Sequence, residues 1–174
     1  MAATATHGKR VDDAYERAGT AALFMCAAPW AGWRDVAVRA RKTTSDWALD
    51  MARVLEGRYA ACGKVIWVGD NLNTHTKGAF YEAFAPKRAR ALGRRLECCD
   101  TPQHGSWLNI AANALRSLTR PCIADRRCGD VASLRKETKA WSHDVNATQR
   151  GVDGRMKIDD ARTKLKSVYP TIKL

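Results

Sequence analysis

Two short stretches near the beginning of the chain predict a pair of strands. Residues Thr20–Ala28 (TAALFMCAA) form an apolar run suited to a buried strand, whereas Arg34–Ala40 (RDVAVRA) alternates between apolar and polar residues, as in a partly exposed strand. Pro29 and Gly32 lie between the two stretches and are typical of a turn. We therefore expect these strands to pair with each other.

Two further strands are expected later in the chain. Val65–Val68 are four consecutive apolar residues, the pattern of a central strand that is covered on both faces. The segment RRLECCD, residues 94–100, predicts another short strand. Both would add to the sheet that the first pair begins.

Apolar residues at helical spacing predict helices between and after these strands. The expected helix starts are Thr44 or Ser45, Pro86, Ser106, Asp130, and Asp159 or Asp160, with the last helix ending before Pro170. The apolar stripes expected to face the core are Trp47, Met51, Val54 and Leu55 with the Arg58 stem at the edge; Leu108, Ala111, Leu115 and Leu118; and Val131, Leu134, Trp141 and Val145.

Strands that alternate with helices indicate one α/β domain with a helical C-terminal part. Residues 20–174 are expected to form this domain. Residues 1–19 have no strand-like pattern and are expected to be poorly ordered.

The chain is strongly basic: thirty Lys and Arg against eighteen Asp and Glu give a formal net charge of +12. A charge of this size attracts polyanions such as nucleic acid, although a soluble basic protein without such a partner is the alternative. No apolar stretch is long enough for a membrane span, and MAATATHGKR has no secretory core. We expect a cytoplasmic, nucleoid-associated protein that has no membrane partner. Its six cysteines are expected to be free thiols, since no Cys-x-x-Cys pair favours zinc.

Asp70 is the leading candidate for chemistry because it directly follows the expected central strand, where loops converge on a crevice. The next residues, NLNTHT, add polar groups that can orient a ligand: Asn71, Asn73, Thr74 and His75. The alternative is that Asp70 and Asn71 only form a turn that leaves the strand.

Four segments in one order carry a resemblance to a known family: VGDNLNTHT, YEAFAPKRARALGRRLE, TPQHGSWLN and DARTKLKSVYP. Together they resemble the transposases of mariner-like bacterial insertion sequences, in the Asp-Asp-Glu superfamily. The resemblance runs from about Gly19 to Pro170. It implies a ribonuclease-H-like, integrase-type mixed sheet flanked by helices.

The resemblance also implies a metal-dependent reaction on DNA. Such enzymes hold two Mg²⁺ (or Mn²⁺) ions on three carboxylates, one ion activating the attacking oxygen and the other stabilising the leaving oxygen. Asp70 matches the second acid of the family. It is therefore the expected catalytic residue and metal ligand.

The other two acids are not found in this sequence. Ala112 occupies the position of the expected Glu, and Ala114 the position two residues further along. The family's first strand, with its Asp, is expected to be missing, since Asp12 and Asp13 match only a connecting segment. One carboxylate of three is too little to hold two Mg²⁺ ions, so metal binding by this chain is not expected.

Three hypotheses about function follow. The first is a transposase catalytic domain that is inactive and keeps affinity for DNA at transposon ends and target. The second is a binding protein that inhibits by holding DNA or a full-length transposase, and the third is a pseudogene product without function. Besides DNA, the candidate partners are a full-length transposase and a second copy of the chain. The residues expected to contact DNA, each with a structural alternative, are Asn71, Asn73, His75, Lys87, Arg88, Arg90, Arg94, Arg95, His104, Ser106 and Asn109.

Overall fold

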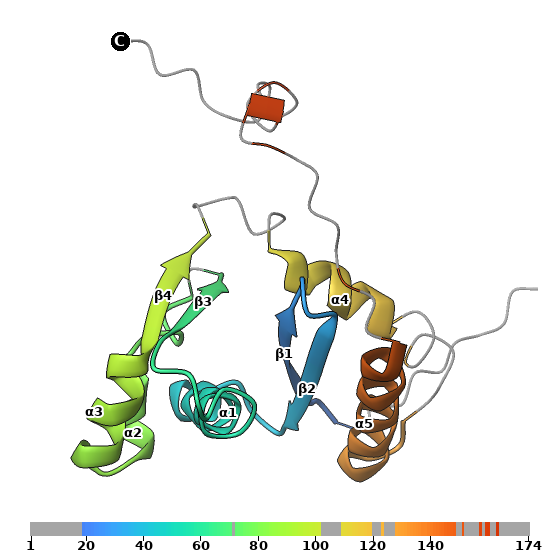
Figure 1. Cartoon of the computed structure of the whole chain (residues 1–174). Helices are drawn as coiled ribbons and strands as arrows, with labels where there is room; N and C mark the ends of the chain where they lie inside the picture. The colour runs from blue at the N-terminus through green and yellow to red at the C-terminus, as the bar shows by residue number, and fades with distance from the viewer. Residues whose placement is uncertain are drawn as a thin grey trace, which may run out of the picture.

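The computed structural model describes residues 19–70, 72–101, 109–119, 123, 128–148, 151, 157, 159–160 and 163. Its elements, in chain order, are β1 (Ala22–Ala28), β2 (Trp33–Arg39), α1 (Thr44–Glu56), β3 (Val65–Gly69), α2 (Ala79–Ala83), α3 (Pro86–Arg95), β4 (Leu96–Asp100), α4 (Ile110–Leu118) and α5 (Val131–Thr148). Figure 1 shows the pair β3–β4 and the pair β1–β2 on either side of the helix α1.

Strands β1 and β2 form the predicted antiparallel hairpin, with Ala22 opposite Arg39 and Ala28 opposite Trp33. The turn is closed by a 3.3 Å hydrogen bond from the Gly32 N–H to the Pro29 carbonyl. Gly32 has φ of 60°, a conformation that glycine adopts without the steric cost of a Cβ atom. The prediction of paired strands joined at Pro29 and Gly32 is confirmed.

Strands β3 and β4 are parallel, with Val65 opposite Leu96 and Gly69 opposite Asp100. The expectation that Val65–Val68 form a central strand covered on both faces is wrong for the part of the chain that the structure describes. There, β3 pairs with β4 alone, and the side chains of Ile66 and Val68 are 65% and 58% exposed. An apolar run shows that a strand can be buried, but it does not indicate whether another strand or helix lies beside it to cover its side chains.

Helix α1 carries the larger core. Its N-cap is Thr43, one residue before the predicted Thr44, because Thr43 and Asp46 form a reciprocal capping box. The predicted stripe is confirmed, and Trp47, Met51 and Leu55 are buried together with residues of α2, α3 and β4. Both strand pairs rest on this helix, since Phe24 of β1 and Trp67 of β3 pack against the same cluster.

A buried ion pair ties α1 to β2. The Arg39 guanidinium donates to both carboxylate oxygens of Asp50, at 2.7 and 3.1 Å. Arg53 lies between Asp50 and Asp35 of β2 and forms an ion pair with each. Paired charges of this kind fix the helix against one strand at a defined register.

Helix α5 covers the outer edge of β2. The Asn146 side chain accepts a hydrogen bond from the Arg34 N–H and donates one to the Arg34 carbonyl, both at 2.8 Å. Arg135 Nε donates to the Val38 carbonyl at 3.2 Å. Since these groups point away from β1, α5 satisfies the edge of β2 that a further strand would otherwise use.

The second core lies between α5, α4 and the hairpin. Trp141 and Leu118 are buried there against Val36. The Asp130 side chain accepts from the Ser133 N–H at 2.7 Å, which confirms the predicted cap of α5.

Helix α4 differs from its prediction. It begins at Ile110 and not at Ser106, and it buries Ala114 and Leu118, whereas Leu115 is 37% exposed. Of the predicted stripe, Leu118 is confirmed as buried, Leu115 is wrong, and Leu108 lies outside the described residues. The helix packs against β1, and Ala114 is buried. The remaining elements add two facts: α2 was not predicted, and most of the predicted helix from Asp159 lies outside the described residues. Among the helices that the structure describes, none is long and apolar enough to cross a membrane.

Candidate functional site

Asp70 lies at the carboxyl end of the parallel pair β3–β4. The Trp67 ring folds back over Gly69, where a Cβ atom would stand 2.0 Å from two ring carbons. Only glycine allows this approach. The same ring packs edge-on against Trp47 of α1, with centroids 5.5 Å apart. The strand end that carries Asp70 is thus fixed on α1.

A hydrogen bond joins Asp70 to the start of α4. Asn109 Nδ2 donates to Asp70 Oδ1 at 3.1 Å. The Asn109 Oδ1 accepts the Ala111 N–H at 3.0 Å, so this one side chain caps α4 and contacts Asp70. Two predicted site residues that are 39 positions apart are therefore brought together.

The groups that the structure describes around Asp70 do not fit two Mg²⁺ ions. Ala112, in the first turn of α4, is exposed and has no ligand atom, and one oxygen of Asp70 already accepts from the Asn109 amide. Among the described residues, no three His, Cys, Asp or Glu side chains lie close enough to hold a metal ion. A pair of Mg²⁺ ions requires more oxygen ligands than this arrangement supplies.

Asp100 is a residue that the sequence analysis did not assign to this site. It is exposed, and it ends β4 directly beside the end of β3, in register with Gly69. A sequence signal was available, since Asp100 ends the predicted strand RRLECCD, much as Asp70 follows the run Val65–Val68. The site therefore presents two carboxylates at neighbouring strand ends.

His75 is held in an aromatic cluster beneath Asp70. Its ring stacks on Trp47 at 5.6 Å and meets the edge of Trp67 at 5.4 Å. His75 Nδ1 lies 3.3 Å from the Asp70 carbonyl oxygen. Burial lowers the pKa of His75, against the opposing effects of that hydrogen bond and of the Asp70 and Asp100 carboxylates. This packing agrees with the structural alternative for His75.

The structure describes only one of the four remaining residues that were predicted near Asp70. Asn73 is exposed in the turn that follows β3. Asn71, His104 and Ser106 lie outside the described residues.

The five basic residues predicted on α3 fall into two groups. Arg88 and Arg95 form contacts with other groups of the protein. Arg88 pairs with Glu56 of α1 at 2.6 and 2.9 Å, and its guanidinium lies over the Phe84 ring. Arg95 donates to backbone carbonyls at the end of α1 and beyond it, which include those of Leu55 and Cys62. Both side chains therefore hold α3 against α1.

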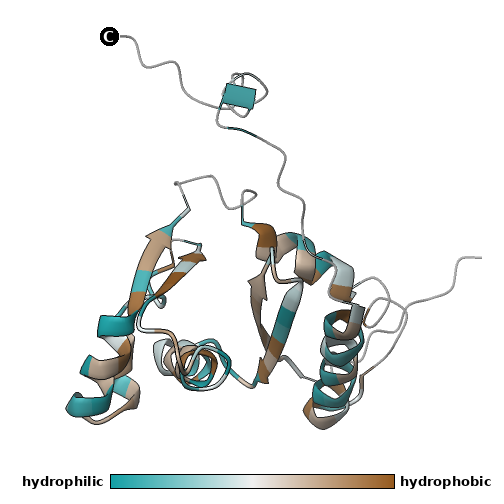
Figure 2. Cartoon of the chain, in the orientation of Figure 1, coloured by the Kyte–Doolittle hydropathy of each residue, from teal (hydrophilic) through white to brown (hydrophobic). Residues whose placement is uncertain are grey.

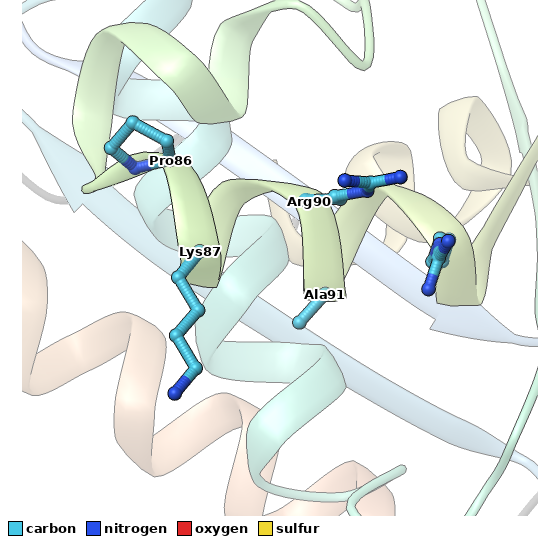
Figure 3. A pocket seen from close by; sticks show the side chains of 5 residues that line it. Pro86, Lys87, Arg90 and Ala91 are labelled. Carbon is cyan, nitrogen blue, oxygen red and sulfur yellow. The ribbon is translucent and has the colours of Figure 1, made fainter.

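Lys87, Arg90 and Arg94 form the second group. They are exposed and form no salt bridge with any residue that the structure describes. With Pro86 and Ala91 they line an open hollow of about 530 Å³ (Figure 3). Figure 2 shows α3 as one of the most hydrophilic elements.

The model of a family described as DDE superfamily endonuclease matches residues 2–135, well over half of the chain, and the match includes Asp70, α3 and α4. Neither the curated proteins nor the solved structures give a match. The chain therefore belongs to the DDE superfamily endonucleases.

Proposed function

We propose that this chain is a transposase-type catalytic domain, of the kind found in mariner-like bacterial insertion sequences, that binds DNA but does not cleave it. Membership of the DDE superfamily endonucleases supports an origin in metal-dependent DNA cleavage. The net charge of +12 supports retained affinity for DNA. The one observation that carries the loss of cleavage is the surroundings of Asp70, where α4 offers an asparagine amide and an alanine in place of a carboxylate.

We assign the domain to the ribonuclease-H-like folds. An antiparallel hairpin, then a helix, then a parallel pair on the same helix supports this assignment. The edge of β1 away from β2 and the edge of β3 away from β4 are unpaired within the described residues. One further strand would join the two pairs into a single mixed sheet.

The residues that remain at the site bind and orient rather than react. Asp70 and Asp100 place negative charge at the strand ends, and the Asn109 side chain fixes the direction of the Asp70 carboxylate. Asn109 and Asn73 offer amide groups that can contact the phosphates of a nearby DNA strand. In the family, the divalent metal would supply the activated oxygen.

The test is nicking of a supercoiled plasmid in Mg²⁺ or Mn²⁺. The wild type should nick no faster than buffer. Ala112→Glu alone should not restore activity, because it brings the site to two of the three acids that the family uses. Asp70→Ala is the matched control: nicking by the wild type that disappears in Asp70→Ala would overturn the proposal.

A second candidate function, interference with an intact transposase, is favoured by strand β3. Its unpaired edge and the exposed Ile66 and Val68 side chains are features that associate with other strands. The intact transposase should lose strand-transfer activity when this chain is added in excess. Ile66→Lys should relieve that inhibition while DNA binding is kept; unchanged inhibition would exclude β3 as the contact.

A further inference from the structure

Helix α3 separates its basic side chains by direction. Successive residues of an α-helix are turned by about 100°, so Lys87, Arg90 and Arg94 fall within about 60° of one another. The buried Ala89 and Leu92 lie on the opposite side. The three basic residues, here called the α3 stripe, therefore face solvent together.

We propose that the α3 stripe binds the phosphodiester backbone of DNA. This inference rests on the proposed function and names the surface that carries it. The stripe is distinct from the Asp70 region: α3 leads into Leu96, the first residue of β4, whereas Asp70 follows the last residue of β3. Since the two strands are parallel, α3 and Asp70 lie at opposite ends of the pair (Figure 1).

The chemistry of the stripe fits a row of phosphates. A guanidinium donates two parallel hydrogen bonds to a phosphate, and an ammonium acts as a compact positive charge. Arg88, in contrast, is already paired with Glu56, and Arg95 is held by backbone carbonyls, so the basic side chains of α3 that remain available to a ligand lie on one face. Ala91, which lies near the charged side chains, is small. The hollow is therefore open to a DNA strand that lies across it.

The length of the stripe also matches. From Lys87 to Arg94 the helix rises about 10.5 Å, at 1.5 Å per residue. Each strand of duplex DNA carries one phosphate per about 3.4 Å of helix axis, so a stripe that runs along this axis spans about three phosphates. The contacts are to backbone and carry no base readout, and binding through them is therefore independent of sequence.

Three neutralised phosphates set a measurable salt dependence. Each contributes about 0.9 to the slope of log K against log salt, or about 2.7 together. Between 50 and 200 mM salt this corresponds to roughly a 40-fold change in affinity that depends on the stripe. Removal of the three charges should make the slope shallower by that amount.

The experiment measures binding of the full chain to a mixed-sequence duplex by fluorescence anisotropy over this salt range. Lys87→Gln, Arg90→Gln and Arg94→Gln are combined in one variant, with circular dichroism to verify helix content. The control variant replaces three exposed lysines outside the stripe, by Lys42→Gln, Lys136→Gln and Lys139→Gln. Two of these are on α5, which lies far from α3 in Figure 1, and both variants lose the same net charge.

A slope that becomes shallower by about 2.7 in the stripe variant, and by much less in the control, supports the inference. Equal effects in the two variants would overturn it, because net charge alone would then explain binding. An unchanged stripe variant would overturn it while leaving DNA binding, and the proposed function, intact. If the wild type binds no DNA, both the inference and the proposed function are wrong. Binding to anionic phospholipid vesicles but not to DNA would assign the stripe to a membrane surface instead.

Discussion

Truncation of Arg39 should destabilise the protein because it leaves the buried Asp50 carboxylate without its main partner. Arg39 donates two hydrogen bonds to Asp50, a residue that is only 3% exposed. In Arg39→Ala the Asp50 carboxylate stays buried. Its remaining ion-pair partner among the described residues is Arg53, whose Nε is 3.9 Å away.

The magnitude follows from burial. Removal of one partner from a buried pair costs about 3–5 kcal/mol. The Arg39 side chain is 28% exposed and Arg53 remains near, so solvent and this second charge offset part of the loss. We expect the free energy of unfolding to fall by about 2–3 kcal/mol, which for a chain of this size lowers Tm by about 5–10 °C.

The assay is urea unfolding at pH 7, followed by circular dichroism. Glu56→Gln is a matched control, since Glu56 forms a similar two-bond pair with Arg88 but both side chains are exposed, and its loss should cost less than about 1 kcal/mol. Arg39→Met combined with Asp50→Leu removes both charges of the pair and should be far less harmful than Arg39→Ala. If Arg39→Ala costs no more than Glu56→Gln, the burial argument is wrong.

Three further outcomes are expected. Burial, and to a smaller extent the Asp35 charge, raises the pKa of the Cys26 thiol to about 11. In the folded protein at pH 8, iodoacetamide should therefore modify Cys26 far more slowly than the exposed Cys62, as measured by mass spectrometry; equal rates would contradict this. Burial lowers the pKa of His75, so the unfolded chain takes up that proton first as the pH falls below about 6.5, and stability should drop from there toward the folded pKa. That drop, measured by urea unfolding between pH 7 and 5, should be smaller in His75→Phe; an identical drop would assign it to other groups. Gly69→Ala should lower Tm by several degrees because the new methyl group meets the Trp67 ring, whereas Gly63→Ala, with open space around it, should not.

Local patterns predicted the elements well, and long-range contacts explain where they failed. The hairpin and the buried stripe of α1 follow from alternation and helical spacing, which depend on neighbouring residues alone. The exposure of Ile66 and Val68 depends on whether another strand lies beside β3, and no local pattern contains that information. The start of α1 was missed for a different reason, because Thr43 and Asp46 form a local capping box that the sequence analysis did not use. The α4 stripe was missed because it depends on the contact of α4 with β1.

At the candidate site, the sequence identified Asp70 and Asn109 separately but not the hydrogen bond between them. It also treated the basic residues of α3 as equivalent. Arg88 and Arg95 are distinguished from Lys87 only by partners on α1 and just after it, more than thirty residues earlier in the chain. Charge patterning located the surface, and the fold selected which charges remain free.

The contact between Asn146 and Arg34 has a consequence for the order of folding, because it spans 112 residues. The buried residues of the larger core come from one continuous stretch, α1 to β4, which can pack together once it has left the ribosome. The hairpin β1–β2 is synthesised before α5, which supplies the contacts to its outer edge, so that edge stays open until α5 has been made. During synthesis, β1 and β2 are therefore completed after the larger core.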